Sequence, residues 1–388
     1  MKDHMFYERE SGRLDAFAAL TAQTLDPAQV PFAAEVEKNV PVYDMAALSG
    51  ALSDPAERRA LMAEWAWVLG QSSGVLVLKT AYADTAPIDA ATRLFEEIIA
   101  REKAEAGEKA DHFAAAGAND RIWNGLQKLC EADPQVFARY FGNPAIAAVC
   151  EAWLGPGYQM TAQVNLVRPG GQAQEAHRDY HLGFQTADIA ARFPAHVHAL
   201  SSVMTLQGAV AHCDMPVESG PTQLLPFSQL FPEGYMAYRR AEFREFFSTH
   251  AIQLPLAKGD TVFFNPALFH AAGENRSADI HRMANLLQVS SAFGRAMESV
   301  DREGMCKALY PALQELRGAG ALDAAGTEAA IAAAAEGYSF PTNLDTDPPA
   351  GGLAPETQAQ LMHRALAEGM AADAFADALD AQTRRRRA

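Results

Sequence analysis

The tripeptide His177-Arg178-Asp179 restricts the fold and the chemistry of this chain more than any other feature of its sequence. On an extended strand, residues two apart point to the same face, so the imidazole of His177 and the carboxylate of Asp179 can reach one metal ion. A third ligand must come from elsewhere, and His270 is the best-placed candidate. Two histidines and one carboxylate leave one side of an ion open, and non-haem Fe(II) oxygenases use this ligand set. Two imidazoles more than about 8 Å apart could not share an ion, because metal–nitrogen bonds are about 2 Å long.

An arginine suited to bind a dicarboxylate follows the second histidine. Arg282 stands at the start of the apolar run 283–289, which is predicted to be a strand. Its planar guanidinium can hold the C5 carboxylate of 2-oxoglutarate through two parallel hydrogen bonds, while the ketoacid end chelates iron. His281 and Arg276 are alternatives by spacing. Arg282 is preferred because it leads directly into the strand, whereas Arg276 lies in a predicted turn.

Charge and composition narrow the partners. Asp and Glu number 48 against 32 Lys and Arg, a formal net charge of −16, so we expect neither nucleic acid nor a membrane as a partner, but a small-molecule substrate. No apolar run approaches the roughly 20 residues of a membrane helix, and the first residues lack the apolar core of a signal peptide. We therefore expect a cytoplasmic protein. The four cysteines have no CxxC spacing, which predicts small buried thiols rather than a zinc site or disulfides.

Hydrophobic patterns predict helices before and after a region rich in strands. Alternation predicts strands at 74–79, 160–167, 199–207, 222–225, 254–264 and 283–291. Helical periodicity predicts a helix of about 15 residues from Pro55, a second over 88–106, and two short helices within 119–155. Many short strands with glycine and proline turns favour a double-sheet β fold covered on one side by helices.

The chain beyond Phe293 is alanine-rich and predicted to be mostly helical. Residues 319–335 fit either a helix or a partly ordered loop. Residues 340–352 are predicted to be a loop before a last helix from Pro355. Arg384–Arg387 are predicted to form a solvated basic tail.

These segments resemble the phytanoyl-CoA dioxygenase family of Fe(II)/2-oxoglutarate-dependent oxygenases. The resemblance covers about residues 55–292. The residues that carry it are His177-Arg178-Asp179, the turn and strand 218–228, and 259–264 through 270–275 to Arg282, with weaker similarity at 74–78, 121–123 and 154–158. It implies a mainly β fold with flanking α-helices, in which a double-stranded β-helix (jelly-roll or cupin-like) core packs against N- and C-terminal helices.

The resemblance also implies a division of the chain and roles for its residues. We expect an N-terminal arm at 1–54, an oxygenase domain at 55–295 with its β core at about 158–292, and a helical, alanine-rich extension at 296–388. By the family pattern His177, Asp179 and His270 bind Fe(II), Arg282 binds 2-oxoglutarate, and O2 is the co-reactant.

Two positions depart from the family pattern. Phe227-Ser228-Gln229 stands where the family often has Gly-Ser-His, and Ala272 stands where a hydroxyl commonly assists the cosubstrate. Other groups must then help to bind 2-oxoglutarate. Gln163 and Asn165 share one face of the strand before His177, and either can donate an amide hydrogen bond.

Other chemistry-bearing residues have a structural alternative. Trp123, Tyr180, His181 and Phe184 are candidates for the substrate pocket, although His181 could also be a metal ligand or an exposed loop residue, and Trp123 a core residue. His196 and His198 have strand spacing but no accompanying carboxylate, so a structural role is expected for both. His212 is expected to pack in the core.

The sequence thus predicts an Fe(II)- and 2-oxoglutarate-dependent dioxygenase that hydroxylates a small molecule and releases succinate and CO2. Asp179 favours hydroxylation, because halogenases of this superfamily have a small residue at that position. No cluster of Lys and Arg near the site suggests a coenzyme A phosphate, so an acyl-CoA substrate follows from the family name alone. Two alternatives remain: a cupin-like metal enzyme that does not use 2-oxoglutarate, and a catalytically inactive jelly-roll binding protein.

Overall fold

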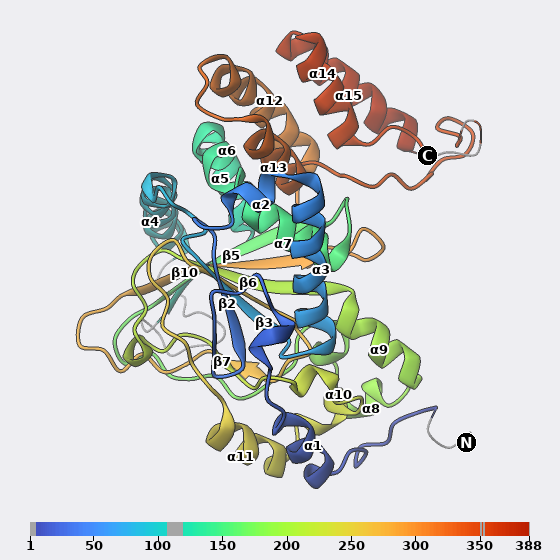
Figure 1. Ribbon diagram of the computed structural model, residues 1–388. Helices are drawn as coiled ribbons and strands as arrows, with labels where there is room; N and C mark the ends of the chain where they lie inside the picture. Colours follow the sequence, from blue (N-terminus) through green and yellow to red (C-terminus); the bar gives the residue numbers. More distant parts are fainter. Residues whose placement is uncertain (1–4, 107–118, 350, 352–353, 388) are drawn as a thin grey trace.

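A mixed sheet of eight strands lies at the centre of the chain (Figure 1). The computed structural model describes residues 5–106, 119–349, 351 and 354–387. The strand order is β1 (Glu35–Glu37), β2 (Val40–Asp44), β3 (Val75–Lys79), β8 (Thr261–Phe264), β6 (Thr205–Ala211), β10 (Arg282–Ser290), β5 (Gln159–Val167) and β4 (Asn119–Ile122). Only β2 and β3 are parallel; the other neighbours are antiparallel. A second sheet pairs β7 (Gln223–Leu224) with β9 (His270–Ala271).

The two faces of the large sheet bury different partners. Because side chains alternate along a strand, Phe263 of β8 packs among the helices, whereas Val262 and Phe264 pack toward the small sheet. The helices of the first face include α3 (Pro55–Gln71), α4 (Ala86–Ala106), α5 (Gly125–Ala132), α6 (Pro134–Phe141) and α7 (Pro144–Leu154). The large mixed sheet with flanking helices that the sequence predicts is therefore confirmed.

Three of these helices begin with the same local signal. An aspartate or asparagine precedes a proline at the start of α3, α6 and α7, and its side chain accepts hydrogen bonds from the next free backbone N–H groups. This residue satisfies donors that have no partner inside the helix, while proline at the first position loses nothing. Asp133-Pro134 thereby starts a helix that the sequence analysis did not separate, so 119–155 holds three helices instead of two.

Most predicted strands are confirmed, and two differ. Residues 74–79 and 222–225 contain β3 and β7, and 160–167 and 283–291 match β5 and β10 to within one residue at each end. In 199–207, the first residues belong to helix α9 (Ala195–Val203) and the strand starts at Thr205, because a short apolar run fits a helix as well as a strand. In 254–264, the turn at Gly259, where φ is +94°, delays the strand to Thr261.

The N-terminal and connecting segments contain short α-helices and 3-10 turns. They are α1 (Leu14–Thr21), α2 (Ser49–Ser53), α8 (Ala187–Ala190), α10 (Gly234–Ala237), α11 (Ala241–His250) and the 3-10 turns η1 (Pro27–Gln29), η2 (His181–Phe184), η3 (Val217–Ser219) and η4 (Ser228–Leu230). The stretch 1–54 contributes β1 and β2 to the large sheet. In Figure 1, α1 and α11 lie at the bottom of the molecule.

The C-terminal helices form an outer layer at the top of Figure 1. They are α12 (Arg302–Gly318), α13 (Ala324–Ala334), α14 (Gln358–Glu368) and α15 (Ala372–Arg386), with α14 and α15 packed on α12 rather than on the sheet. Within the segment 319–335, for which the sequence fits a helix or a loop, residues 324–334 form α13. The helix predicted from Pro355 begins at Gln358 as α14, and it is not the last, because α15 follows it.

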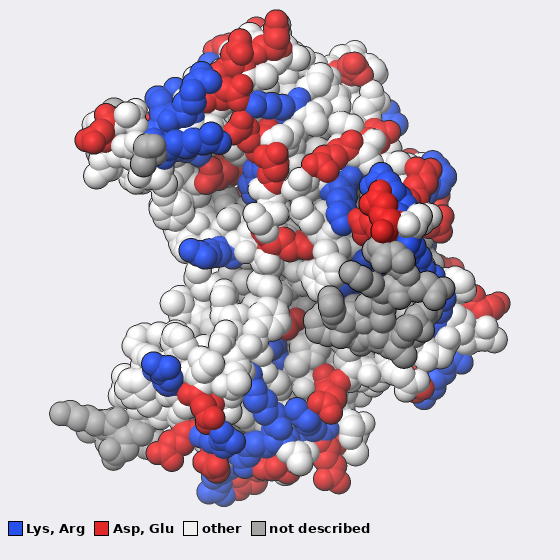
Figure 2. Space-filling view, turned by 180° about the vertical axis from the view of Figure 1, so that it is seen from behind, with Lys and Arg blue, Asp and Glu red and all other residues white. Residues whose placement is uncertain are grey.

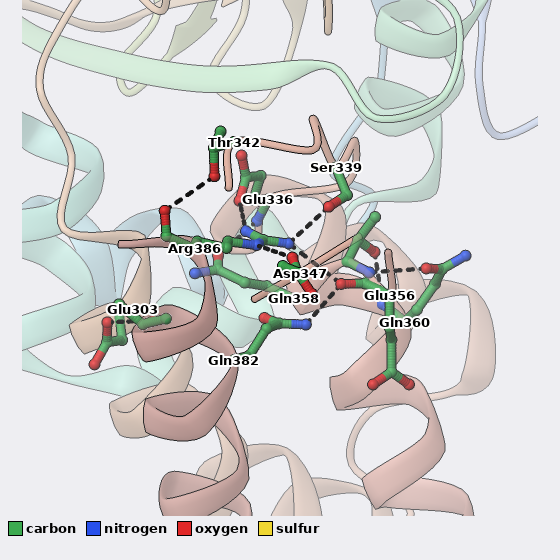
Figure 3. A network of polar contacts seen from close by, with 12 residues as sticks. Glu303, Glu336, Ser339, Thr342, Asp347, Glu356, Gln358, Gln360, Gln382 and Arg386 are labelled. Atoms are coloured by element: carbon green, nitrogen blue, oxygen red, sulfur yellow. Dashed lines mark hydrogen bonds and ion pairs between the residues drawn. The ribbon is translucent and has the colours of Figure 1, made fainter. Parts of the chain in front are cut away.

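The predicted loop 340–352, of which residues 350 and 352 lie outside the described residues, closes the end of α15. Thr342 Oγ1, Asn343 Nδ2 and Thr346 Oγ1 donate to the carbonyl oxygens of Arg386, Arg387 and Arg385, respectively. These are carbonyls that a helix end leaves without partners. Figure 3 shows the network around Arg386, whose Nη1 pairs with Glu336 at 2.5 Å. The sequence predicts a solvated basic tail, but the structure shows this tail bonded to the preceding loop and to Glu336.

Arg386→Ala is expected to destabilise the C-terminal layer. Nη2 donates to Ser339 Oγ at 2.9 Å and to the carbonyl of Glu356 at 3.2 Å, and the side chain is 15% exposed. Loss of these bonds should lower the free energy of unfolding by about 1–3 kcal/mol, measured by urea denaturation. The control Arg384→Ala removes an exposed side chain of the same tail. Equal stability of the two variants would contradict the prediction.

His212 is a core residue, as the sequence predicts. It is 5% exposed, and its ring nitrogens lie 2.8 Å from Thr92 Oγ1 and 2.7 Å from the Tyr140 hydroxyl. Burial lowers the pKa of His212 from 6.5 to about 3. Between these values the unfolded chain binds a proton that the folded protein does not, so acid favours unfolding.

The free energy of unfolding should accordingly fall by about 1.4 kcal/mol for each pH unit below about 6.5 through His212 alone. His212→Asn should reduce this slope, measured by denaturation at several pH values. His363→Asn changes an exposed histidine and should leave the slope as in the wild type. Equal slopes in His212→Asn and the wild type would show that His212 does not titrate this way.

The described helices include none that combines the length and the apolarity needed to cross a bilayer. Figure 2 shows charged side chains of both signs gathered over the C-terminal helices and at the bottom of the molecule, with a largely uncharged band between them. Cys130, Cys150 and Cys306 are buried, Cys213 is half-buried, and all four are free thiols.

Candidate active site

Two backbone segments bring the three predicted metal ligands together. His177 and His270 face each other across an antiparallel bridge, with each backbone N–H donating to the other's carbonyl at 3.0 and 3.1 Å. Their ring centroids are 4.4 Å apart, well inside the limit for sharing an ion. Asp179 Oδ2 lies 3.9 Å from His177 Nε2 and 3.5 Å from His270 Nε2. The ligand atoms all lie within 4.8 Å of one another, so one ion can contact all three.

Backbone carbonyls orient both imidazoles. The Nδ1 of His177 lies 2.9 Å from the carbonyl of Glu175, and the Nδ1 of His270 lies 2.8 Å from the carbonyl of Leu268. When Nδ1 carries the proton and donates to these carbonyls, each Nε2 presents its lone pair to the space between the rings. The Nε2 of His270 is buried and has no hydrogen-bond partner among the described residues.

The electrostatics of the triad favour the charge states that a metal needs. Burial, and secondarily the neighbouring His270, lower the pKa of His177, which keeps its imidazole neutral. Burial alone would raise the pKa of Asp179, but the neighbouring imidazoles of His270 and His177 and the amide of Gln207 lower it overall. Gln207 Nε2 donates to Asp179 Oδ2 at 3.1 Å. Gln207, on β6, was not singled out in the sequence, because its role depends on a strand pairing that the sequence does not show.

Arg178 fixes the tripeptide from the opposite side. Its side chain is 2% exposed, and its guanidinium donates to the carbonyls of Ser228 and Phe231 at 2.5 and 3.0 Å. The rings of Tyr235 and Phe269 lie 5.1 and 5.3 Å from its Cζ. Because neighbouring residues on an extended segment point to opposite sides, these contacts help to hold the side chains of His177 and Asp179 toward the cavity.

Arg282 lies in the same cavity as the triad. It is 6% exposed, and its Nη1 donates to the carbonyls of Ser219 and Gly273 at 3.2 and 3.3 Å. No carboxylate among the described residues pairs with it, and burial lowers its pKa to about 10. A buried guanidinium without a counter-charge is costly, and it suits an anionic ligand.

The turn around Gly220 supports this arginine. Gly220 has φ of +77°, and a Cβ there would come within 2.3 Å of the carbonyl oxygen of Glu274. Only glycine fits such an approach without strain. The turn 218–221 therefore packs closely on 273–274, the two segments whose carbonyls hold Arg282.

The cavity has a volume of about 750 Å³ and lies between the large sheet and the triad. Residues of five strands of the large sheet, β4, β5, β6, β8 and β10, line it, including Gln163 and Asn165 of β5. Both amides are nearly buried, and Gln163 Nε2 donates to Gln288 Oε1 at 3.0 Å. Asn165 is on the strand next to β10, which carries Arg282. Ala272 also lines the cavity, as does Thr222, whose hydroxyl the sequence analysis did not consider.

The four predicted pocket residues separate into two pairs. Trp123 and Phe184 line the cavity and are 40% and 61% exposed. Tyr180 is fully buried and His181 is exposed, and neither is among the lining residues. His181 begins the 3-10 turn η2 and its Nδ1 lies near Ser201, whereas Phe184, at the end of the same turn, reaches the cavity.

The other histidines take the structural roles expected of them. His196 and His198 lie on helix α9, not on a strand, and His198 Nε2 lies 3.0 Å from the carbonyl of Ala190. His181 Nδ1 lies 3.4 Å from Ser201 Oγ. Neither His181 nor this pair belongs to the group of residues that can hold a metal.

The departure at 227–229 is structural. Phe227 adopts φ of +69°, a conformation that glycine takes more easily, and its backbone N–H donates to the carbonyl of Ser73. Gln229 Nε2 donates to the carbonyl of Ser72 at 2.7 Å. Gln229 thus joins the loop before β3 and does not line the cavity.

A comparison with protein families matches this architecture to a known one. The family described as phytanoyl-CoA dioxygenase (PhyH) matches residues 70–284, more than half of the chain, including the triad and Arg282. The chain belongs to the phytanoyl-CoA dioxygenase family. The resemblance seen in the sequence is confirmed.

Individual relatives are more distant. Dioxygenase cdmD of Talaromyces verruculosus is 30% identical over 156 residues, which cover 39% of this chain and 46% of that protein, so the match spans about half of the relative's length. Among solved structures, the non-heme alpha ketoglutarate dependent epimerase SnoN of nogalamycin biosynthesis is 22% identical, with a TM-score of 0.43, covering 62% of this chain and 85% of that one. The non-heme alpha ketoglutarate dependent carbocyclase SnoK, also of nogalamycin biosynthesis, is 20% identical, with a TM-score of 0.43, covering 58% of this chain and 83% of that one.

The cofactors of the family, iron and 2-oxoglutarate, fit the residues present. Two imidazoles and one carboxylate meet where the buried Nε2 of His270 has no hydrogen-bond partner among the described residues. The buried guanidinium of Arg282 lacks a carboxylate in the same cavity. The imidazole nitrogen therefore fits iron, and the guanidinium of Arg282 fits a carboxylate of 2-oxoglutarate.

Proposed function

We propose that this protein hydroxylates a small molecule at a C–H bond, with conversion of 2-oxoglutarate and O2 to succinate and CO2. His177, Asp179 and His270 bind Fe(II), and Arg282 binds the C5 carboxylate of 2-oxoglutarate. The observation that carries this proposal is that the triad and a buried arginine without a counter-charge line one cavity. Bound iron, with 2-oxoglutarate and O2, supplies the oxidising chemistry at the C–H bond.

The protein's own residues position and shield the reactants. Gln207 holds the carboxylate of Asp179 through its amide, and the carbonyls of Glu175 and Leu268 set the tautomer of the two histidines. Asn165 donates its amide to 2-oxoglutarate beside Arg282, with Gln163 as a second donor. Trp123 and Phe184 contact the substrate at the exposed side of the cavity. The small sheet and the face of the large sheet exclude bulk water between them.

We further propose that the two sheets together form the double-stranded β-helix of the family. Isolated bridges at His177–His270, Met215–Leu256 and Leu224–Ile252 extend the pairing around β7 and β9. The short strands and bridges then make the second sheet of the jelly roll, and the cavity lies between the two sheets, where small-molecule sites of β-barrels occur.

Two measurements test this function. Under anaerobic conditions, the protein should bind Mn(II) stoichiometrically, and 2-oxoglutarate should bind only to the metal-loaded form, as measured by calorimetry. With Fe(II) and O2, succinate should accumulate, and mass spectrometry of a turned-over substrate should show the gain of one oxygen atom. If succinate is formed but the product has not gained an oxygen atom, the reaction is an oxidation other than hydroxylation.

The alternatives make different predictions for the same measurements. A cupin-like metal enzyme that does not use 2-oxoglutarate should bind Mn(II) but show no binding of the cosubstrate and no succinate. A catalytically inactive jelly-roll binding protein should bind no metal, and His177→Ala should then change nothing. His196→Ala, which alters an exposed histidine outside the triad, is the matched control for His177→Ala.

A further inference from the structure

The active-site cavity contains unsatisfied hydrogen-bond acceptors besides the metal-binding nitrogen. Gln207 Oε1 and Glu298 Oε2 are buried and have no partner among the described residues, as is true of His270 Nε2. All three residues line the cavity. Asn165 Oδ1 is in the same state, but it lies two residues further along β5 than Gln163, toward the pairing of Val167 with Arg282. Since buried polar groups in folded proteins are normally paired, the oxygens of Gln207 and Glu298 require a hydrogen-bond donor.

The orientation of both oxygens is determined by the other half of each group. Gln207 Nε2 donates to Asp179 Oδ2 at 3.1 Å, so its Oε1 is the end of the amide that remains available. Glu298 Oε1 accepts the backbone N–H of Asn124 at 2.6 Å, which leaves Oε2. Burial raises the pKa of Glu298, although Asn124 and the nearby amide of Gln163 oppose this.

Amide side chains lie between the two oxygens. Gln207 on β6 lies directly opposite Gln288 on β10, whose Oε1 accepts from Gln163 Nε2 at 3.0 Å. Gln163 in turn is close enough to Glu298 to affect its pKa. We call Gln207, Gln288, Gln163 and Glu298 the acceptor strip. It leads from the metal ligand Asp179 toward Asn124, the neighbour of Trp123 in the sequence.

Apolar side chains adjoin the acceptor strip. Val262, Phe264 and Leu286 line the cavity beside it, on the same face of the large sheet. A carboxylate or phosphate at the strip would face oxygens that carry negative charge or partial negative charge, and it would be repelled. A hydroxyl or amine would supply the O–H or N–H that the two oxygens lack.

We propose that the substrate of this oxygenase has an apolar body and carries a hydrogen-bond donor, a hydroxyl or an amine, that binds Gln207 and Glu298. This inference rests on the proposed function of the cavity. Gln207 and Glu298 are specificity-determining residues, and Gln207 connects the bound donor to the carboxylate of the metal ligand Asp179. The substrate's C–H bond is then held near the metal by a group on the substrate itself.

Three probes with one apolar body test the proposal: cyclohexylmethanol, cyclohexylmethylamine and cyclohexanecarboxylate. Mn(II) bound with 2-oxoglutarate enhances the relaxation of probe protons near the metal, and the Zn(II) form is the diamagnetic reference. The alcohol and the amine should bind at least about tenfold more tightly than the carboxylate, and Glu298→Ala and Gln207→Leu should each weaken their binding roughly tenfold. Glu298→Gln should preserve binding of the alcohol and weaken that of the amine, which distinguishes the two donors.

The control Glu328→Gln makes the same chemical change on the exposed side of α13, away from the cavity, and should bind all probes as the wild type does. Equal binding of the three probes, no binding of any, or wild-type binding of the alcohol and the amine in Glu298→Ala and Gln207→Leu would overturn the proposal. The affinity for Mn(II) and 2-oxoglutarate is measured in every variant. If the wild type binds no 2-oxoglutarate, the proposed function fails, and probe preference is then read with Mn(II) alone.

Discussion

Asp179→Asn is expected to abolish metal binding and turnover while leaving the protein folded. The substitution keeps the shape of the side chain but replaces an anionic ligand oxygen by a neutral amide. Because outer-shell partners of metal ligands are worth about 10- to 100-fold in affinity, loss of a ligand charge should lower the affinity for Mn(II) by more than about 100-fold. Succinate release should fall at least as far, measured with Fe(II), 2-oxoglutarate and O2.

The metal-free variant should unfold within about 1 kcal/mol of the metal-free wild type, since only the Gln207 hydrogen bond to Oδ2 is weakened. Asp188→Asn is the matched control. It makes the same change on a side chain that is 73% exposed and pairs only with Arg9 at the surface, so it should bind metal as the wild type does. Wild-type affinity for Mn(II) in Asp179→Asn would exclude this carboxylate as a ligand.

Arg282→Ala is expected to separate binding of the cosubstrate from binding of the metal. Removal of a buried partner of a charged pair typically costs 2–5 kcal/mol, so the affinity for 2-oxoglutarate should fall by roughly 30-fold or more. Arg282→Lys retains the charge but not the two parallel donors, and should lose roughly tenfold. The affinity for Mn(II) should change little in either variant, because Arg282 is not a ligand.

The control for Arg282 is Arg276→Ala. Arg276 is the exposed arginine that the sequence left as an alternative, and its removal should leave the affinity for 2-oxoglutarate unchanged. A larger effect at Arg276 than at Arg282 would reverse the assignment. Unchanged affinity in Arg282→Ala, with metal still bound, would show that 2-oxoglutarate is held elsewhere.

The sequence was sufficient to predict which side chains meet, because the common direction of His177 and Asp179 depends on local spacing. Their meeting with His270 depends on one antiparallel bridge, and the family pattern supplied that long-range pairing. Arg282 was distinguishable from Arg276 because it begins an apolar strand, which is also a local signal. These residues could therefore be named before the structure was known.

Residues whose role depends on a cross-strand neighbour could not be predicted. Gln207 reaches Asp179 because β6 pairs with β8 and the backbone of Asp179 is bonded to Pro266 just after β8, and nothing in the sequence around Gln207 indicates this pairing. Glu298 lies after the last strand, in a segment without regular structure. Tyr180 and His181 were placed in the pocket because they follow Asp179, but neither is among the residues that line the cavity.

The anchoring of Arg178 has a consequence for how this protein can diversify. The guanidinium is held by the carbonyls of Ser228 and Phe231 and by two aromatic rings, none of which belongs to the strands that form the large sheet. Apart from Gln207, which bonds Asp179, and Arg282, side chains on β5, β6, β8 and β10 can therefore be exchanged without loosening the segment that carries two of the three proposed ligands. Substitutions in the cavity wall that faces the substrate therefore need not disturb the triad. One fold can thus acquire new substrates through successive substitutions in that wall.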